Sequence, residues 1–488
     1  MTIDQGRRTP VYNIAADISF MDRLSLKGHM KRILLLVISL YFPLIAFTQA
    51  INISGTVSGA DGQTIRMIAH DDFISKKIIT LDKCAIGNDG SFELNFAIRE
   101  TIIGYLDINY QRAEIFLEPD SSYVLEISYD KENQLASYFD RQGMLYNLVE
   151  PEGIELNRRI WQFNEMYNTF VMINFDKIYK LRERNPIIDF RNEIRSAFPD
   201  TDSGYFADYV TYKLADIEQY ARLKGRNTLA GDYFTGKPVL KENVEYIFFF
   251  EQFFEKYLIT SPEIITISDL IVAVNDNADK QFIMDALAKE TYLKEKNFRE
   301  LVLLHGLRSL YFDATFERPQ LLRMMEDISK TTSNPVHRKI ALNLLTTLTA
   351  LNPGTPAPDL QLTGIAGQKF NLRNITGKPI LLNFFRSGQQ GTANAFDRLS
   401  ELYNLYNAGL EIISVSMDHN ASDYLELANS GNYYWTFAHY GNDPLVYDKY
   451  NIRDMPLYIL IDVEGNIYSC PAPSPGDALE KLILKVIH

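Results

Sequence analysis

The chain has very few cysteines: only Cys84 and Cys470 occur among its 488 residues, far apart in the sequence. Two such thiols cannot form the disulfide framework that holds small secreted domains together. Neither cysteine has a second cysteine nearby at the spacing of a redox or metal motif. We therefore expect two separate, half-buried thiols rather than a reactive pair.

Metal-binding and phosphate-binding motifs are also absent from the sequence. The seven histidines are scattered, with no His-x-His and no His-Glu-x-x-His, and the chain has neither a G-x-S-x-G motif nor a phosphate-binding loop. The segment "DHNASD" at residues 418–423 gathers two carboxylates and a histidine, and we interpret it as a solvated loop with a helix cap. The sequence therefore predicts no metal site and no cofactor.

Positive charge is scarce as well. The formal net charge is −13, and no long basic run occurs. A phosphate backbone would be repelled by such a chain, so nucleic acid is not an expected partner. The hydrophobic content of 46% and the aromatic content of 12% are typical of a globular protein. A globular chain of this length is expected to form about three domains.

The stretch "MKRILLLVISLYFPLIAFTQA" at residues 30–50 has the layout of a secretory signal peptide. Two basic residues precede an apolar run at 33–47, and cleavage is expected after Ala50. An uncleaved anchor is the alternative, but the run contains Pro43 and is shorter than the roughly 18–20 apolar residues that span a bilayer. Residues 1–29 form an upstream segment outside this layout. We expect a soluble mature protein in the periplasm or cell envelope, with no stable membrane span.

Residues 51–133 are predicted to form an all-β sandwich. Short runs of alternating apolar and polar residues, such as "TIRMIAH" and "AEIFLEPDSSYVLEISYD", are separated by turn residues. The turn "NDGSF" at 88–92 and the break at Pro119 and Asp120 are of the kind that joins neighbouring strands.

Residues 134–350 are predicted to form an all-α region. In "DSGYFADYVTYKLADIEQYARL" apolar residues recur every three to four positions, and Asp202 or Ser203 is placed to cap the helix. The run "EYIFFFEQFFEKYLI" is aromatic on all sides, so we expect it to pack between neighbouring helices. An aromatic cofactor-binding surface is the alternative. Further helices are predicted in "KQFIMDALAKETYLKEKNFRELVLLHGLRSLYF" and "PVHRKIALNLLTTLTAL".

A proline-rich linker is predicted at residues 351–358, within "LNPGTPAPDL". Residues 359–488 then alternate between strand and helix. The predicted strands are "PILLNFF", "LEIISVSMD", "LYILID" and "GNIYSC", and the predicted helices are "TANAFDRLSELYNLYN", "ASDYLELANSG" and residues 477–486. Strands that are almost continuously apolar imply an α/β domain with a central sheet covered on both faces.

This C-terminal segment resembles the thioredoxin-like fold, and within it the TlpA-like or redoxin-type thiol-disulfide oxidoreductases of the cell envelope. The resemblance is carried by "APDLQLTGIAGQKFNLRNITGKPILLNFF", "LEIISVSMD" and "YNIRDMPLYILIDVEGNIY". A β-sandwich with a helical insert also looks like the N-terminal half that often precedes such domains. The resemblance implies an active site where "PILLNFF" enters its helix.

The W-C-x-x-C motif of the family is absent at that position. Gly388 takes the place of the Trp, and Gln389 and Thr392 take the places of the two cysteines. The family's chemistry needs a thiolate at the helix N-terminus and a second thiol that resolves the mixed disulfide. The amide of Gln389 is not a nucleophile, and the hydroxyl of Thr392 would need an adjacent base. The resemblance therefore implies a degenerate active site with no catalytic residue.

The resemblance also implies a cis-proline loop at Met455 and Pro456. In the family, the backbone of the residue before the proline pairs with an extended segment of the partner, a form of strand addition. The alternative is that Pro456 is kept because the loop needs that turn. The predicted peptide-binding surface consists of Phe385, Gly388, Gln389, Thr392, Met455 and Pro456.

The sequence therefore predicts an exported thioredoxin-like protein that has no redox-active cysteine pair, is not an enzyme, and binds a protein or peptide in the cell envelope. One alternative is a thiol-disulfide oxidoreductase that uses Cys470 in an unconventional way. Another alternative is a purely structural C-terminal domain that supports the other two.

Overall fold

The computed structural model describes residues 49–108, 111–129, 144–153, 155–199, 203–261, 263–418, 421–430, 433–441, 445–452 and 455–487. Residues 50–488 form one compact unit. The apolar run of the predicted signal peptide lies outside the described residues, so the signal peptide stays a prediction. Within the described ranges, no helix is both long enough and apolar enough to cross a bilayer.

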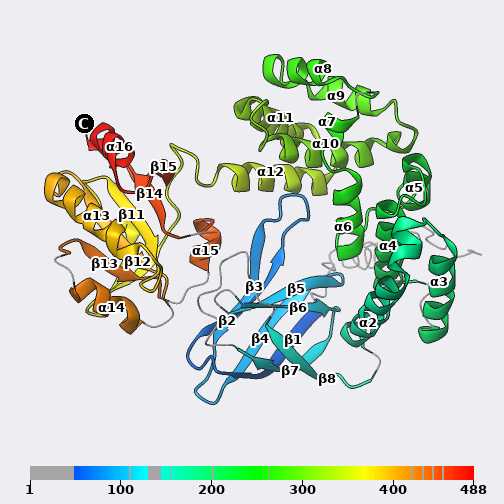
Figure 1. Ribbon diagram of the computed structural model, residues 1–488, viewed down its shortest axis with the longest axis horizontal. Helices are drawn as coiled ribbons and strands as arrows, with labels where there is room; N and C mark the ends of the chain where they lie inside the picture. The colour runs from blue at the N-terminus through cyan, green and yellow to red at the C-terminus, as the bar shows by residue number, and fades with distance from the viewer. Residues whose placement is uncertain are drawn as a thin grey trace, which may run out of the picture. The chain divides into compact units, whose positions relative to one another are not determined.

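The N-terminal domain is a β-sandwich, as predicted, with two four-stranded sheets in the orders β4-β1-β7-β8 and β3-β2-β5-β6 (Figure 1). Buried and exposed residues alternate along β4 (Ser91–Ile98), because successive side chains of a strand point to opposite faces. Side chains from both sheets share one core, which includes Ile53 and Leu106. The other strands are β1 (Gln49–Ser58), β2 (Thr64–His70), β3 (Ile78–Ala85), β5 (Ile102–Ile108), β6 (Gln111–Leu117), β7 (Ser122–Ser128) and β8 (Leu145–Glu150).

The sandwich extends beyond residue 133, where the sequence analysis places its end. Strand β8 pairs antiparallel with β7, with Tyr146 opposite Ile127. The predicted boundary is wrong here because β8 has only six residues, of which Leu148 alone is buried, so its sequence does not alternate clearly between apolar and polar residues. The helical region begins only at α2 (Leu156–Phe175), where the Glu155 side chain accepts a hydrogen bond from the Arg158 amide.

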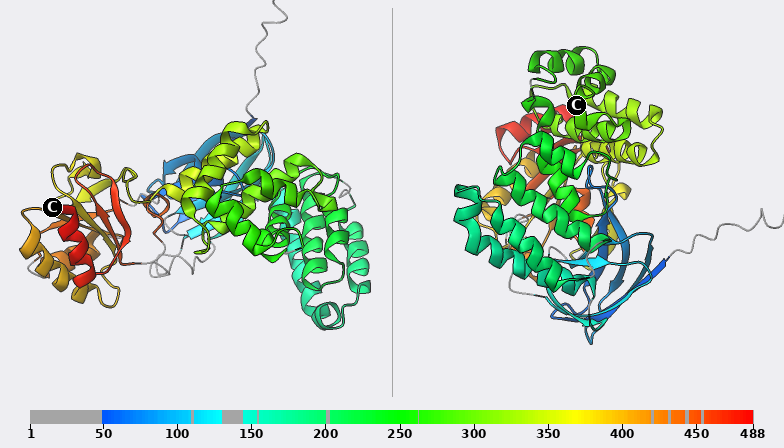
Figure 2. Two further views of the ribbon diagram at one scale, coloured as in Figure 1. Left: turned by 90° about the horizontal axis from the view of Figure 1, so that it is seen from above. Right: turned by 90° about the vertical axis from the view of Figure 1, so that its right-hand side faces the viewer.

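The central region is helical, as predicted, and Figure 2 shows α2, α3 and α4 lying side by side. The periodic run near residue 210 forms α4, with Phe206, Leu214 and Ile217 buried. Its N-cap residue is Gly204 rather than Ser203, with a φ of 91° that residues with a Cβ rarely adopt. Asp202 lies outside the described residues. The α-helices after α2 are α3 (Asn185–Ala197), α4 (Tyr205–Tyr220), α5 (Arg226–Tyr233), α6 (Val244–Phe253), α7 (Tyr257–Thr260), α8 (Ile267–Ile271), α9 (Lys280–Leu287), α10 (Lys296–Leu310), α11 (Arg318–Thr331) and α12 (Pro335–Thr349).

The aromatic run at α6 packs in a core, as predicted from its all-round aromatic character. Phe249 and Phe250 are fully buried, and the ring of Phe234 lies 5.2 Å from that of Phe249. The same core takes in residues from α5, α9, α10, α11 and α12. These rings stabilise the helical region through burial and edge-to-face or stacked contacts.

The C-terminal domain is built on a seven-stranded sheet in the order β10-β9-β13-β12-β11-β14-β15. The central strand β11 is parallel to β12 and antiparallel to β14. The strands are β9 (Gln361–Gly364), β10 (Lys369–Asn371), β11 (Ile380–Phe385), β12 (Glu411–Ser416), β13 (Thr436–His439), β14 (Leu457–Ile461) and β15 (Ile467–Ala472). The helices are α13 (Thr392–Tyr406), α14 (Ala421–Ser430), α15 (Leu445–Lys449) and α16 (Asp477–Ile487).

Both faces of this sheet are covered, as the apolar strands predict. On one face Phe396 of α13, Tyr424 of α14 and Leu479 of α16 share a core with alternate residues of β11 and β12. On the other face Val446 of α15 packs with Leu360, which precedes β9. Figure 1 shows α13 and α15 on opposite sides of the strands. The two cores fix β11 rigidly and therefore fix the start of the turn that follows it.

The proline-rich linker pairs with the edge of the sheet instead of running free. The amide of Gly354 donates to the Ile467 carbonyl at 2.7 Å, and the amide of Ile467 donates to the Thr355 carbonyl at 2.8 Å. Pro356 forms an isolated bridge with Asn466. The expectation of an extended linker is wrong for residues 351–355, which form turns with the Thr355 amide bonded to the Asn352 carbonyl at 3.1 Å. The linker pairs with the chain at the start of the edge strand β15.

Candidate functional site

The candidate site is the turn between β11 and α13, residues 386–391. All six residues of β11 are buried, so the strand delivers the chain to this turn at a fixed position. Gly391 is the N-cap residue of α13, and its φ of 91° lies in the left-handed region that favours glycine. The amide of Ala395 donates to the Gly391 carbonyl at 3.0 Å, which is the first helical bond. The predicted strand-to-helix junction is present.

Thr392 lies at the first position of α13 with its hydroxyl turned inward. Its Oγ1 donates to the Arg386 carbonyl at 3.0 Å, and its amide donates to the Gln389 carbonyl at 3.2 Å. The residue is buried. The hydroxyl therefore closes the turn, and neither of these two bonds would activate it as a nucleophile.

Gln389 connects the turn to the proline loop. Its Nε2 donates to the carbonyl of Met455, and its own amide donates to the Arg386 carbonyl at 3.3 Å. The peptide bond between Met455 and Pro456 is cis. The Gln389 side chain thus occupies a backbone acceptor of the loop. No local sequence pattern predicts this contact, because the two residues are 66 positions apart.

Asp418 supports the same turn from the end of β12. Its carboxylate accepts a hydrogen bond from the Ser387 amide at 3.1 Å and another from the Ser416 hydroxyl at 2.8 Å. Asp418 is half-buried. The interpretation of this segment as a solvated loop is therefore wrong for Asp418. The signal in the sequence for this contact was an acidic residue directly after a buried strand. His419 lies outside the described residues.

His439, at the end of β13, holds the backbone of Asp418. Its Nδ1 accepts from the Gly441 amide at 3.1 Å, so its Nε2 carries the proton and donates to the Asp418 carbonyl at 2.7 Å. Burial lowers the pKa of His439. The imidazole is therefore a neutral structural link beneath the turn.

The structure brings the predicted surface residues to one region but exposes only some of them. Gly388 and Pro456 are exposed, Gln389 is partly buried, and Met455 is partly buried and packs against the core. Phe385 is only 1% exposed, because its ring packs edge-on against that of Phe396 at 4.8 Å. The prediction that Phe385 and Thr392 form part of an accessible surface is therefore wrong.

The two cysteines lie away from the turn. Cys84 is on β3, at an edge of the sandwich, and Cys470 is on β15, at an edge of the C-terminal sheet. Both are free thiols and partly buried. Burial raises the pKa of Cys84, and it raises the pKa of Cys470 to about 11. At neutral pH both therefore stay protonated and are poor nucleophiles.

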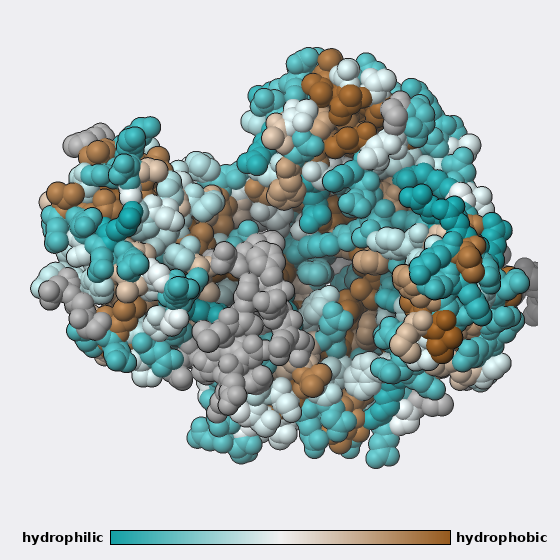
Figure 3. All heavy atoms as spheres, viewed as in Figure 1, coloured by the Kyte–Doolittle hydropathy of each residue, from teal (hydrophilic) through white to brown (hydrophobic). Residues whose placement is uncertain are grey.

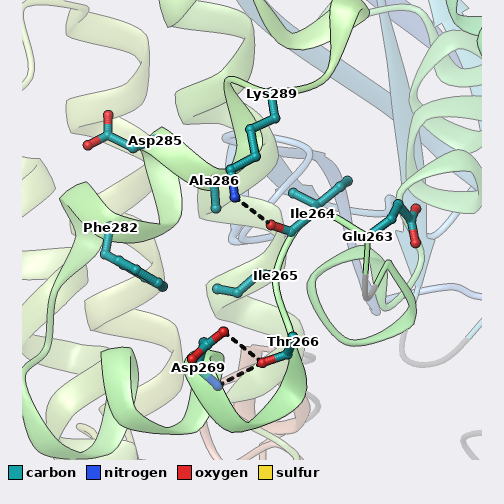
Figure 4. A pocket seen from close by; sticks show the side chains of 9 residues that line it. All are labelled: Glu263, Ile264, Ile265, Thr266, Asp269, Phe282, Asp285, Ala286 and Lys289. Atoms are coloured by element: carbon teal, nitrogen blue, oxygen red, sulfur yellow. Dashed lines mark hydrogen bonds between the residues drawn. The ribbon is translucent and has the colours of Figure 1, made fainter.

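No group of three or more metal-ligating side chains occurs among the residues that the structure describes. A pocket with a volume of about 290 Å³ lies in the helical region, lined by residues of the α7–α8 connection and of α9 (Figure 4). Several of its polar groups are bonded to the protein: Thr266 donates to Asp269 at 2.8 Å, and Lys289 donates to the Ile264 carbonyl at 3.3 Å. We interpret these contacts as structural.

Residues 377–467, which include β11, the turn and β14, match a family described as thioredoxin-like. The C-terminal domain is thioredoxin-like. This thioredoxin-like domain is similar to the thiol-disulfide oxidoreductase ResA of Geobacillus kaustophilus (strain HTA426), with 29% identity over 136 residues, which cover 26% of this chain and 74% of the relative. The ResA of Geobacillus thermodenitrificans (strain NG80-2) is 27% identical over 136 residues, which again cover 26% of this chain and 74% of the relative.

Solved structures with similarity to the thioredoxin-like domain carry related names. The thioredoxin domain of a thiol-disulfide oxidoreductase from Bacteroides vulgatus is 26% identical, with a TM-score of 0.27, and covers 28% of this chain and 99% of that structure. A putative thiol:disulfide interchange protein DsbE from Chlorobium tepidum is also 26% identical, with a TM-score of 0.26 and the same coverage. These similarities lie within about a quarter of the chain.

Proposed function

We propose that this protein is exported to the cell envelope and binds a protein or peptide through its thioredoxin-like domain, without dithiol exchange. The binding surface is the exposed part of the candidate site, formed by Gly388, Gln389, Met455 and Pro456. The observation that carries the proposal concerns Gln389 and Thr392, the two positions where the related oxidoreductases have the cysteines of the W-C-x-x-C motif. Gln389 and Thr392 both use their side chains as hydrogen-bond donors to backbone carbonyls. Neither the Gln389 amide nor the Thr392 hydroxyl can form or resolve a mixed disulfide.

The expected affinity is modest and reversible. A few net hydrogen bonds at roughly 0.5–1.5 kcal/mol each are offset by the ordering and association costs. Burial of Phe385 no longer adds to binding, because that ring already lies in the core. We expect a dissociation constant in the micromolar range.

An insulin-reduction assay with dithiothreitol tests the absence of dithiol exchange. We expect the same rate with and without the protein. A rate increase that disappears in the Cys84→Ser, Cys470→Ser double variant would contradict the proposal. It would support the alternative function, a thiol-disulfide oxidoreductase, which the names of the similar proteins favour and the raised pKa of Cys470 opposes.

The binding surface can be blocked at Gly388. A Cβ at this exposed glycine would meet no atom within 4 Å, so Gly388→Arg adds bulk at the surface without disturbing the turn. Gly231→Arg is the matched control, because Gly231 is also exposed, has equally open surroundings, and lies in α5 of the helical region. Met455→Asp is less suitable, since Met455 packs against the core.

The readout is capture of partners from an envelope extract by the immobilised protein. We expect at least one partner to be lost with Gly388→Arg and retained with Gly231→Arg. Equal capture by both variants would show that binding belongs to another surface, or that the thioredoxin-like domain is purely structural. A chain lacking residues 355–488 that captures the same partner would lead to the same conclusion.

Export is tested by N-terminal sequencing of the protein from cell fractions. We expect a mature chain that begins near Ile51 in the envelope fraction. An intact terminus at Met30 in the membrane pellet would contradict signal cleavage.

A further inference from the structure

One end of the α2–α3–α4 bundle combines exposed apolar residues with exposed cations. It contains the end of α2, the π-helix Asp176–Lys180, the turn into α3, and the end of α4. The guanidinium of Arg184 donates to the Leu223 carbonyl at 2.5 Å, so the two chain segments lie together. We refer to residues 172–184 and 220–224 as the helix-end surface.

The helix-end surface lies beyond the last close aromatic contact between α2 and α3. The rings of Phe170 and Phe190 stack at 4.1 Å with an interplanar angle of 1°. Past this pair, Ile178 turns inward and is fully buried. Tyr179 is partly buried against the same core, and its ring lies 4.9 Å from that of Phe175. Met172, Ile173 and Leu181 are exposed.

The exposed apolar side chains of this surface form a cluster. Four of them occur within ten residues, namely Met172 (75% exposed), Ile173 (68%), Phe175 (49%) and Leu181 (67%), and Tyr220 (53%) lies at the end of α4. A second group of exposed apolar residues, Ile267 (43%), Val272 (48%) and Phe282 (44%), occurs at α8–α9 with lower exposure. Figure 3 shows apolar patches on an otherwise largely hydrophilic face. Single exposed apolar residues are normal on soluble proteins, whereas a cluster marks an interaction site.

The charge of the surface is opposite to that of the whole chain. It carries six cations, Lys177, Lys180, Arg182, Arg184, Arg222 and Lys224, and two carboxylates, Asp176 and Glu183. Lys180 pairs with Asp176 at 2.8 Å, and Lys224 pairs with two carboxylates outside the surface, Glu218 at 2.7 Å and Asp232 at 2.9 Å. Lys177 and Arg182 are exposed beside the apolar cluster. A chain with a formal net charge of −13 thus presents a positive, apolar end.

We propose that the helix-end surface docks on a bilayer that contains anionic phospholipid. Apolar side chains at the end of a helix can enter the boundary between headgroups and acyl chains, while neighbouring Lys and Arg attract the lipid phosphates. A second copy of the chain fits less well, because a symmetric contact would place the same positive residues opposite each other. This inference does not depend on the proposed peptide binding.

Co-sedimentation with vesicles tests the proposal. Phosphatidylcholine vesicles with and without phosphatidylglycerol are compared, at low and high NaCl. We expect binding to the anionic vesicles that decreases with salt, because salt screens exposed charges. The apolar run at 33–47 can bind both vesicle types, so all variants are compared as chains of the same length.

Two variants address the surface, each with a matched control. Met172→Ser with Leu181→Ser removes apolar contacts, and Phe312→Ser with Leu405→Ser is its control, at positions that are both 67% exposed elsewhere. Lys177→Glu with Arg182→Glu reverses the charge, and its control is Lys296→Glu with Lys481→Glu, also exposed. We expect each surface variant to weaken binding to anionic vesicles by at least about tenfold, and each control to leave it unchanged.

A fluorescent reporter distinguishes docking by this surface from binding by the apolar run at 33–47. Phe175→Trp places an indole in the cluster, and its emission should shift to the blue only with anionic vesicles. Equal binding to both vesicle types, no shift, or unaltered binding of the surface variants would overturn the proposal. It would also be overturned if sedimentation showed a dimer that Met172→Ser with Leu181→Ser dissociates, because the surface would then belong to a second copy.

Discussion

Strand β11 and the turn that follows it are adjacent in the chain, but they are held in place by different forces. Every side chain of β11 is buried between two cores, and its backbone pairs with β12 and β14. The turn at 386–391 is held mainly by hydrogen bonds from Ser387, Gln389 and Thr392. Burial therefore maintains the strand, and a few polar contacts maintain the turn.

This difference explains how a thioredoxin-like domain can keep its fold without its thiols. The free energy of the fold comes mainly from apolar burial, to which the residues at the helix start contribute little. Gln389 and Thr392 instead form side-chain hydrogen bonds to backbone carbonyls, and each such bond makes a modest net contribution to stability. The following substitutions probe the contrast between strand and turn.

The largest effect is expected for Phe384→Ala in the strand. Phe384 is fully buried, and its ring lies 5.1 Å from that of Tyr450. Loss of the ring should lower the free energy of unfolding by about 3–5 kcal/mol, because a cavity replaces it. Urea unfolding followed by the fluorescence of Trp435, which is buried in this domain, measures the change. A loss below about 1 kcal/mol would show that burial does not dominate here.

The second prediction concerns pH. Strand β11 has no ionisable side chain, so its contribution to the free energy of unfolding should not change with pH. Burial lowers the pKa of His439, so between that pKa and about 6.5 the unfolded state binds a proton that the folded state does not. The stability that depends on neutral His439 is therefore present above about 6.5 and lost as the pH falls.

His439→Gln provides the comparison. The variant should be less stable at neutral pH, because it loses the bonds to Asp418 and Gly441. Between pH 7 and 5 it should lose less stability than the parent. His70 and His305, whose pKa values burial lowers to about 4, are present in both proteins and cancel in the difference. If the stabilities of the parent and the variant changed in parallel with pH, His439 would not be the source of the pH dependence.

A smaller effect is expected for Thr392→Val at the helix start. The substitution keeps the shape but removes the donor to the Arg386 carbonyl. We expect a loss of about 0.5–1.5 kcal/mol in urea unfolding. Thr392→Ser, which retains the hydroxyl, is the control and should recover most of that contribution.

The smallest effect is expected for Gly388→Arg. The site is open and exposed, so the free energy of unfolding should change by no more than about 0.5 kcal/mol. A larger loss would mean that the turn itself depends on this glycine, and the variant would then no longer be a clean block of the binding surface. Thermal unfolding of both the variant and Gly231→Arg measures this.

Much of the fold could be predicted because it follows from local patterns. The apolar runs at β11, β12 and β14 and the aromatic run at α6 were recognisable from composition and spacing alone. Strand β13 and helix α15 were missed. β13 has only four residues, and α15 has five, so neither offers a full period of its pattern.

By itself the sequence determined that the thiols are missing from the turn, because residue identity needs no coordinates: Gln389 and Thr392 stand where cysteines would. It also determined that the strand before the turn is buried, because six consecutive residues of that strand are almost all apolar. Only the tertiary structure decided which side chains remain accessible there. Exposure and hydrogen bonding depend on residues distant in the chain, such as Phe396 against Phe385 and Met455 against Gln389, and no local pattern encodes those contacts.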